Sequence, residues 1–231
     1  MVSINTSALQ HSFEITHAND LAYIFRESVR KVGAICGTSE VTRFFRLATV
    51  QSETSGFELR GEIVKYAFLA LHLGASFRTD PLYQPVRQSM LWGHSGVHPN
   101  VGLNRMFRST DLMIAEGLCA ATDGVAPGFG AACKTTRQSR PHSAVHAAFE
   151  ICAKTNPKRI EALGADHVRS SLEQYSSHLT RQDLTRHDFV VDWLICTYHL
   201  GFSFDRNPLF AWVPEALAKD GLSHIGDILD G

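Results

Sequence analysis

Histidine is the residue type with which this chain is best equipped for chemistry. The sequence holds 12 histidines, and two short segments repeat a His-x-x-x-His spacing, His94 with His98 and His142 with His146. Residues four apart share one face of a helix, so two imidazoles could hold one transition-metal ion. Glu150, one turn after His146, is the one carboxylate close to either pair. We favour surface or capping roles for these histidines, with metal binding as the alternative.

A second candidate is the segment 128–135, which reads GFGAACKT. It resembles a phosphate-binding loop, but Cys133 stands where the second glycine should be and no strand precedes it, so we discount it. Cys133 lies beside Lys134, which would lower the pKa of its thiol. A nucleophilic pair of Cys133 with His142 lacks a third residue to orient the histidine.

Other catalytic arrangements do not stand out. The chain has no G-x-S-x-G, H-E-x-x-H or G-x-G-x-x-G motif, and no evident pair of catalytic carboxylates. The usual grounds for proposing an enzyme are therefore missing. We favour a protein without catalytic activity that needs no cofactor.

The clearest pattern is a repeat. Residues 72–86 read HLGASFRTDPLYQPV and residues 199–213 read HLGFSFDRNPLFAWV, with eight of fifteen positions identical at an offset of 127 residues. We call the shared sequence HLGxSFxx(D/N)PL the signature. Three helical patterns recur near the same offset. They open near Ala18 and Val145, near Ser39 and Asp166, and over 57–73 and 183–200.

The first part of each signature predicts the end of a helix. Gly74 and Gly201 follow long apolar helices and suit the position just past a helix end. His72 and His199 lie in the last turn, where an imidazole can serve unpaired carbonyls and meets the negative end of the helix dipole. If the halves pack about a pseudo-twofold axis, the two histidines could form a site. We favour a structural role at each corner.

The second part of each signature predicts a new helix. Asp80 and Asn207 are good N-cap residues, and each precedes a proline at the first helical position. Phe77 and Phe204 are expected to fill the corner between the two helices. Trp212 stands where the first copy has proline, so the fold of the unit does not require it.

These patterns predict an all-α protein, a helical bundle of two pseudo-symmetric halves from an internal duplication. We expect a first helical unit over 1–120, a flexible connection over 121–141 and a second unit over 142–231. The first unit carries an extra helix at about 103–120, and the connection is rich in glycine, proline and basic residues. The pattern leaves open whether the halves share one core or form two domains.

Composition limits the partners. A net charge of −1 over 231 residues favours neither nucleic acid nor an acidic membrane surface, although Lys134, Arg137 and Arg140 form a small basic cluster. The longest apolar run, 63–73, is too short to span a bilayer. Five cysteines without a CxxC spacing, and an N-terminus without signal-peptide features, predict a reducing cytoplasm.

We therefore predict a binding protein, a helical adaptor, chaperone-like or immunity-type module, that recognises a protein partner in grooves between helices. The alternative is a metal-dependent enzyme on a helical scaffold, with the four histidines of the two pairs as ligands of a transition metal. Aromatic residues are enriched in binding hot spots. The candidate binding residues are His72, Phe77, Asp80, Tyr83, His199, Phe204, Asn207, Phe210 and Trp212.

Overall fold

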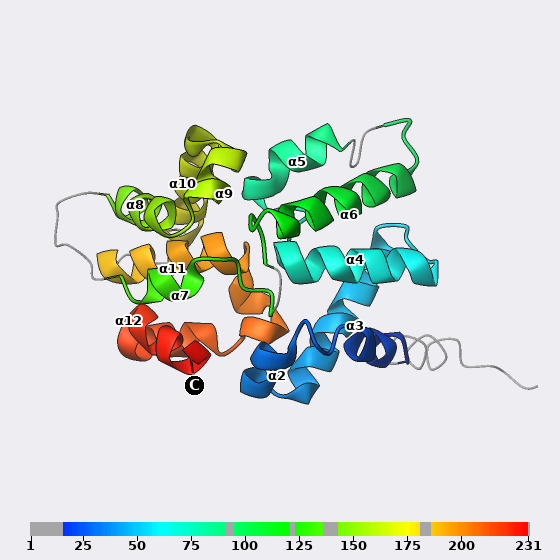
Figure 1. Ribbon diagram of the computed structural model, residues 1–231, viewed down its shortest axis with the longest axis horizontal. Coiled ribbons are helices and arrows are strands. Elements are labelled where there is room, and N and C mark those ends of the chain that lie inside the picture. The colour runs from blue at the N-terminus through cyan, green and yellow to red at the C-terminus, as the bar shows by residue number, and fades with distance from the viewer. Residues whose placement is uncertain (1–15, 91–94, 121–122, 136–142, 181–185, 231) are drawn as a thin grey trace, which may run out of the picture.

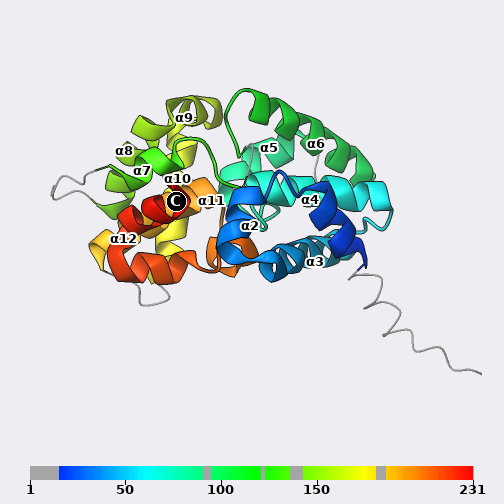
Figure 2. The ribbon, with the colours of Figure 1, turned by 60° about the horizontal axis from the view of Figure 1, so that its bottom comes forward.

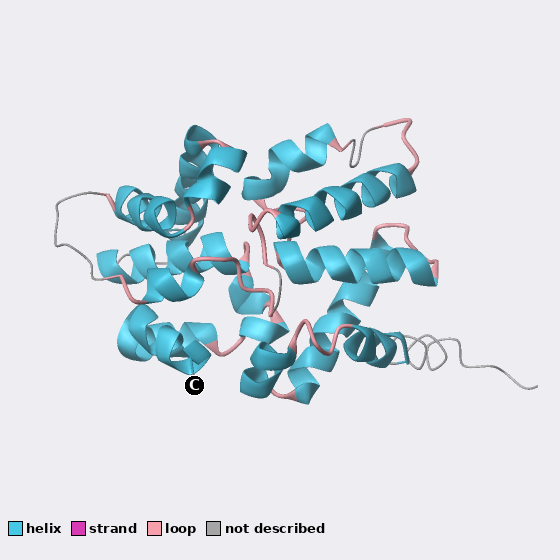
Figure 3. Ribbon diagram, viewed as in Figure 1, coloured by secondary structure: helices cyan, strands magenta, loops and turns pink. Residues whose placement is uncertain are grey.

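The computed structural model describes residues 16–90, 95–120, 123–135, 143–180 and 186–230. These residues form helices joined by loops, with no strand among them (Figure 1; Figure 3). The prediction of an all-α fold is confirmed. In this part of the chain no helix combines the length and the apolar character needed to cross a membrane.

The first half begins with a helix over residues 16–24. It continues with α2 (Arg30–Cys36), α3 (Thr38–Thr54), α4 (Arg60–Leu73), the 3₁₀ turn η1 (Pro81–Tyr83), α5 (Gln84–Ser89) and α6 (Pro99–Ala115). The predicted helix that opens near Ala18 is interrupted by turns at 25–29. The start of α4 is set by Glu62, whose carboxylate accepts a hydrogen bond from the backbone N–H of Leu59 at 3.1 Å.

The second half holds the remaining elements. They are α7 (Phe129–Cys133), α8 (Ala144–Thr155), α9 (Pro157–Leu163), α10 (Ala165–Thr180), α11 (His187–Leu200), the 3₁₀ turns η2 (Phe204–Arg206) and η3 (Pro208–Phe210), and α12 (Val213–Asp230). Side chains cap two of these helices. Ser143 accepts from the backbone N–H of His146 at 3.2 Å, and Asn156 accepts from that of Arg159 at 3.3 Å.

The bounds of the elements repeat along the chain. Shifted by 127 residues, α2, α4 and η1 coincide with α9, α11 and η3, and α3 begins where α10 begins. The order of these elements is the same in both halves. The sequence offset is therefore also an offset of secondary structure.

Part of the expected flexible connection is folded. Ala126, Phe129 and Ala132 are buried, and α7 packs against α8, α11 and α12 (Figure 1). Residues 136–142, with the basic residues Arg137 and Arg140, lie outside the described residues. A short apolar stretch in a loop-like composition was enough to form a packed helix, because its neighbours bury it.

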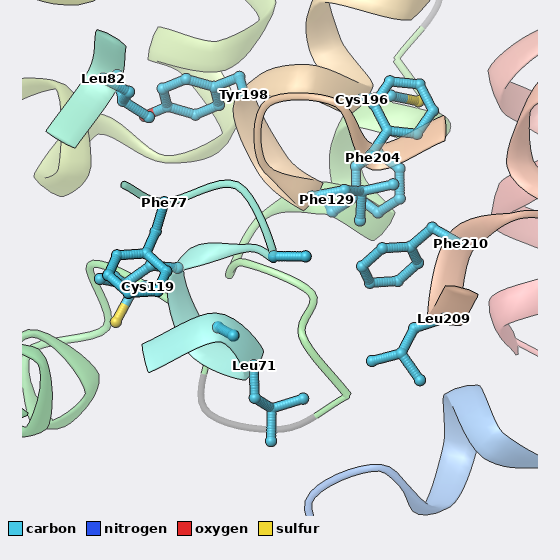
Figure 4. Packing of buried hydrophobic residues seen from close by; sticks show 14 of the residues in the cluster. Leu71, Phe77, Leu82, Cys119, Phe129, Cys196, Tyr198, Phe204, Leu209 and Phe210 are labelled. Carbon is cyan, nitrogen blue, oxygen red and sulfur yellow. The ribbon is translucent and has the colours of Figure 1, made fainter. Parts of the chain in front are cut away.

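Buried apolar side chains from both halves form one continuous cluster. The elements that follow the signatures cross between the halves, because η1 packs against α10 while η3 packs against α2 and α3 (Figure 2). Figure 4 shows Leu71 and Phe77 of the first half in one packed region with Phe204, Phe210 and the α7 residue Phe129. Each half thus completes the core of the other.

Candidate functional site

The two signatures meet at their glycines. Gly74 has a φ of 98° and Gly201 a φ of 96°, a conformation that favours glycine. A Cβ atom on Gly74 would lie 3.1 Å from the Cα of Gly201, and one on Gly201 would lie 3.0 Å from the Cα of Gly74. The two helix ends therefore touch backbone to backbone. This contact brings the residues after each glycine into the other half.

The predicted binding residues lie mostly in the interior. Trp212 is partly buried, and its indole N–H donates to the carbonyl of Leu209 at 3.1 Å. The other side chains support the fold and do not form a surface that a partner could reach. The buried ones are His72, Phe77, Asp80, Tyr83, His199, Phe204, Asn207 and Phe210.

His72 and His199 occupy separate surroundings. The Nδ1 atom of His72 lies 2.6 Å from the carbonyl oxygen of Ala120, and its ring packs on Phe68. The His199 ring packs on Phe129 at 5.3 Å between centroids, and neither of its ring nitrogens has a hydrogen-bond partner among the described residues. Burial lowers the pKa of both imidazoles, so both are neutral near neutral pH.

Asp80 and Asn207 cap the turns that follow them. The backbone N–H of Leu82 donates to Oδ1 of Asp80 at 2.9 Å, and that of Leu209 donates to Oδ1 of Asn207 at 3.1 Å. The N-cap prediction is confirmed, with a proline next in both cases. The capped elements are 3₁₀ turns, which lead on to α5 and α12.

Asp80 also reaches into the second half. Its Oδ2 atom accepts a hydrogen bond from the backbone N–H of Phe202 at 3.1 Å, and its Oδ1 atom accepts one from the Tyr175 hydroxyl. The carboxyl group is fully buried, and this burial raises its pKa although both hydrogen bonds act in the opposite direction. Asp80 thus holds two aromatic residues that belong to the other half.

Those two aromatic residues form part of a surface groove. The Phe202 ring stacks on Tyr175 with centroids 5.4 Å apart, and His178 meets it edge-on at 5.8 Å. Phe202, Tyr175 and His178 separate and share two hollows, which we call the inner and outer hollows of the Phe202 groove. Counting space open to solvent, the inner hollow measures about 360 Å³ and the outer about 800 Å³.

The inner hollow lies between α10, α11 and η2. Trp193 supplies a further aromatic face, and Asp205 and Arg206 supply charge. Neither Asp205 nor Arg206 forms an ion pair with another described residue. The chain enters η2 through Ser203, whose φ of 59° is uncommon for a residue with a side chain. This lining suits binding through aromatic packing and charge.

A buried cation lies deeper between the halves. Arg159 of α9 is 1% exposed, and its Nη2 atom donates to the hydroxyl of Tyr83 at 2.8 Å. Its guanidinium carbon lies 4.6 Å from the centroid of the Tyr198 ring. The Nε and Nη1 atoms of Arg159 have no hydrogen-bond partner in the described part of the chain. Tyr83, a predicted binding residue, therefore serves as an acceptor for this cation.

The predicted metal pairs are incomplete in the structure, because His94 and His142 lie outside the described residues. His98 caps α6 by accepting a hydrogen bond from the backbone N–H of Asn100 at 3.3 Å. His146 forms an exposed pair with Glu150 at 3.2 Å. Within residues 16–230, apart from the undescribed gaps, no group of three or more histidine, cysteine, aspartate or glutamate residues could hold a metal ion.

The environment of Cys133 differs from the expectation. Its thiol is buried, and burial raises its pKa to about 12. The prediction that Lys134 lowers this pKa is wrong, because desolvation outweighs the neighbouring charge. The Lys134 ammonium instead pairs with Asp230 at 2.6 Å.

The sequence prediction omits Tyr175, His178 and Phe202. A usable signal existed, because the second half carries larger side chains at these positions than the first half does. The same reasoning from differences between the halves had selected Trp212. The counterparts at the offset of 127 residues are Ala48, Gln51 and Ala75.

Comparison of the chain with protein-family models, with curated proteins and with solved structures gave no match. Function must therefore be argued from the residues themselves. The Phe202 groove combines a hollowed surface, aromatic side chains and charges without ion-pair partners among the described residues. It is the strongest candidate site in that part of the chain.

Proposed function

We propose that this protein is a non-enzymatic binding protein whose Phe202 groove holds a segment of a protein partner. The observation that carries the proposal is the use of a buried carboxylate, Asp80, to position Tyr175 and Phe202. Burying a carboxylate costs free energy through lost hydration. The second signature caps its turn with the neutral Asn207, so the fold of the unit does not need that charge.

A protein segment suits the groove better than a compact ligand does. The two hollows lie on either side of Phe202 and share three lining residues, so one extended chain can occupy both. Neighbouring side chains of an extended segment point in opposite directions and alternate ones point the same way, which would place separate side chains in the two hollows. The aromatic walls suit an apolar side chain, and Arg206 and Asp205 suit polar neighbours.

We further propose that the two halves descend from one duplicated helical unit. The repeated signature, the matching bounds of six elements and the contact between Gly74 and Gly201 support this origin. Aromatic residues stand in the second half where the first has alanine, which fits a binding surface confined to one copy. The five cysteines, all described, form no disulfide, which fits the reducing cytoplasm that we expect.

The test is a selection of binders from a random peptide library, presented both internally and at free C-termini, with the full chain as bait. We expect enriched peptides whose affinity, measured by fluorescence anisotropy, falls at least about tenfold in Phe202→Ala. This variant installs the residue that the first half carries at the equivalent position. Thermal melting verifies that it remains folded.

The matched control is Leu112→Ala, which removes an exposed apolar side chain from α6, outside the groove. We expect it to bind the selected peptides as the wild type does. If no peptide is enriched, or if Phe202→Ala binds as tightly as Leu112→Ala, the proposed function is wrong.

A further inference from the structure

The two hollows of the Phe202 groove differ in charge. The inner hollow carries Arg206 and Asp205. The outer hollow adds Thr79, Gln174 and other uncharged residues to the three shared ones, of which only His178 can carry a positive charge. A charged group of the ligand is therefore expected in the inner hollow.

The base of Arg206 is held in place by η2. Its backbone N–H donates to the carbonyl of Ser203 at 3.0 Å, and the N–H of Asn207 donates to the carbonyl of Phe204 at 3.0 Å. Phe204 is buried and packs on Trp193 with ring centroids 4.8 Å apart. The exposed guanidinium thus starts from a fixed backbone, and its planar fork of donors matches a carboxylate.

The inner hollow is small. Its volume of about 360 Å³ lies near the lower end of ligand pockets, which span roughly 300–1,000 Å³. It can hold about one large residue. A chain that continued through it would have to leave past the charged rim, whereas a chain that ends there would place its terminal group on that rim.

We infer that the inner hollow takes the C-terminal residue of the partner, with its apolar side chain against Trp193 and Phe202 and its free carboxylate on Arg206. Capture of a terminal carboxylate is a recognised mode of peptide recognition. The preceding residues cross Phe202 into the outer hollow. Asp205 repels a second negative charge and so selects against an acidic side chain at the last position. This inference rests on the proposed function and specifies which end of the segment binds.

The experiment uses one selected peptide in two forms, with a free C-terminal carboxylate and with a C-terminal amide. We expect the amide to bind at least about tenfold more weakly to the wild type. Arg206→Met keeps an apolar stem without charge, and we expect it to bind both forms equally and weakly. Asp205→Asn should bind the free carboxylate more tightly, because it removes a repulsion.

The outcomes separate the inference from the proposed function. If both peptide forms bind the wild type equally and Phe202→Ala weakens both, the inference is overturned and the proposed function stands. If Arg206→Met retains the preference for the free carboxylate, Arg206 is not its partner and the inference is again overturned. If neither form binds at all, the proposed function fails and the inference falls with it.

Discussion

The Asp80 carboxylate accepts a hydrogen bond of 3.1 Å from the backbone N–H of Phe202, which lies 122 residues further along the chain. The same carboxylate accepts the hydroxyl of Tyr175 and caps η1. Asn207, its counterpart in the second signature, also caps its turn but carries no charge. One residue therefore combines a local role, which both halves share, with a long-range one.

Replacing Asp80 separates these two roles. Asp80→Ala leaves the Phe202 N–H and the Tyr175 hydroxyl without an acceptor, and we expect the free energy of unfolding to fall by about 3 kcal/mol. Asp80→Asn retains one acceptor oxygen and should cost about 1 kcal/mol. Urea unfolding measures both changes. Equal losses in the two variants would show that the long-range hydrogen bonds contribute nothing.

The same residue predicts a pH dependence. Burial raises the pKa of Asp80 in the folded protein above its value in the unfolded chain. Between the two pKa values the folded state binds more protons, so the stabilising contribution is complete below the unfolded pKa and is lost as the pH rises through the folded pKa. We expect wild-type stability relative to Asp80→Asn to decline from about pH 4 upwards. A difference independent of pH contradicts this.

The contact between the helix ends predicts a contrast between two glycines. Gly56 and Gly74 have positive φ values of 80° and 98°, so alanine is strained at both positions. Gly56→Ala meets no atom within 4 Å, and we expect it to cost about 1–2 kcal/mol. Gly74→Ala also meets the Cα of Gly201 and should cost at least about twice as much. Thermal denaturation compares them, and equal losses would rule out a close-packed contact.

The buried guanidinium of Arg159 predicts opposite effects for two variants. Tyr83→Phe removes the acceptor of its Nη2 donor and should destabilise the protein by about 1–3 kcal/mol. Arg159→Met replaces the charge with an apolar side chain of similar length, and we expect stability to be unchanged or higher by up to about 4 kcal/mol. A double-mutant cycle in urea measures the coupling. Strong destabilisation by Arg159→Met would mean that the cation is well paired.

The metal alternative has a direct measurement. We expect elemental analysis of protein purified without a histidine tag to find less than about a tenth of an equivalent of any transition metal. His146→Ala should leave thermal stability unchanged, because its pair with Glu150 is exposed and such pairs contribute little. A stoichiometric metal that is lost in His146→Ala would restore the metal-dependent interpretation.

Local chemistry made much of the fold predictable. The ends of α4 and α11 follow from Gly74 and Gly201, and the starts of η1 and η3 follow from the caps Asp80 and Asn207. These signals act between residues a few positions apart, so the sequence displays them. The predictions failed where packing outweighs local composition. The turns at 25–29 interrupt an apolar pattern, and α7 forms inside a segment rich in glycine.

The sequence by itself determined that the chain is helical, where the main helices end and that its pattern repeats after 127 residues. Only the tertiary structure decided which polar side chains are buried and which aromatic side chains line a surface. Asp80 meets Tyr175 and Phe202 because Gly74 and Gly201 let two distant helix ends touch. Burial and long-range hydrogen bonds depend on how remote surfaces fit together, and no local spacing of residues encodes that fit.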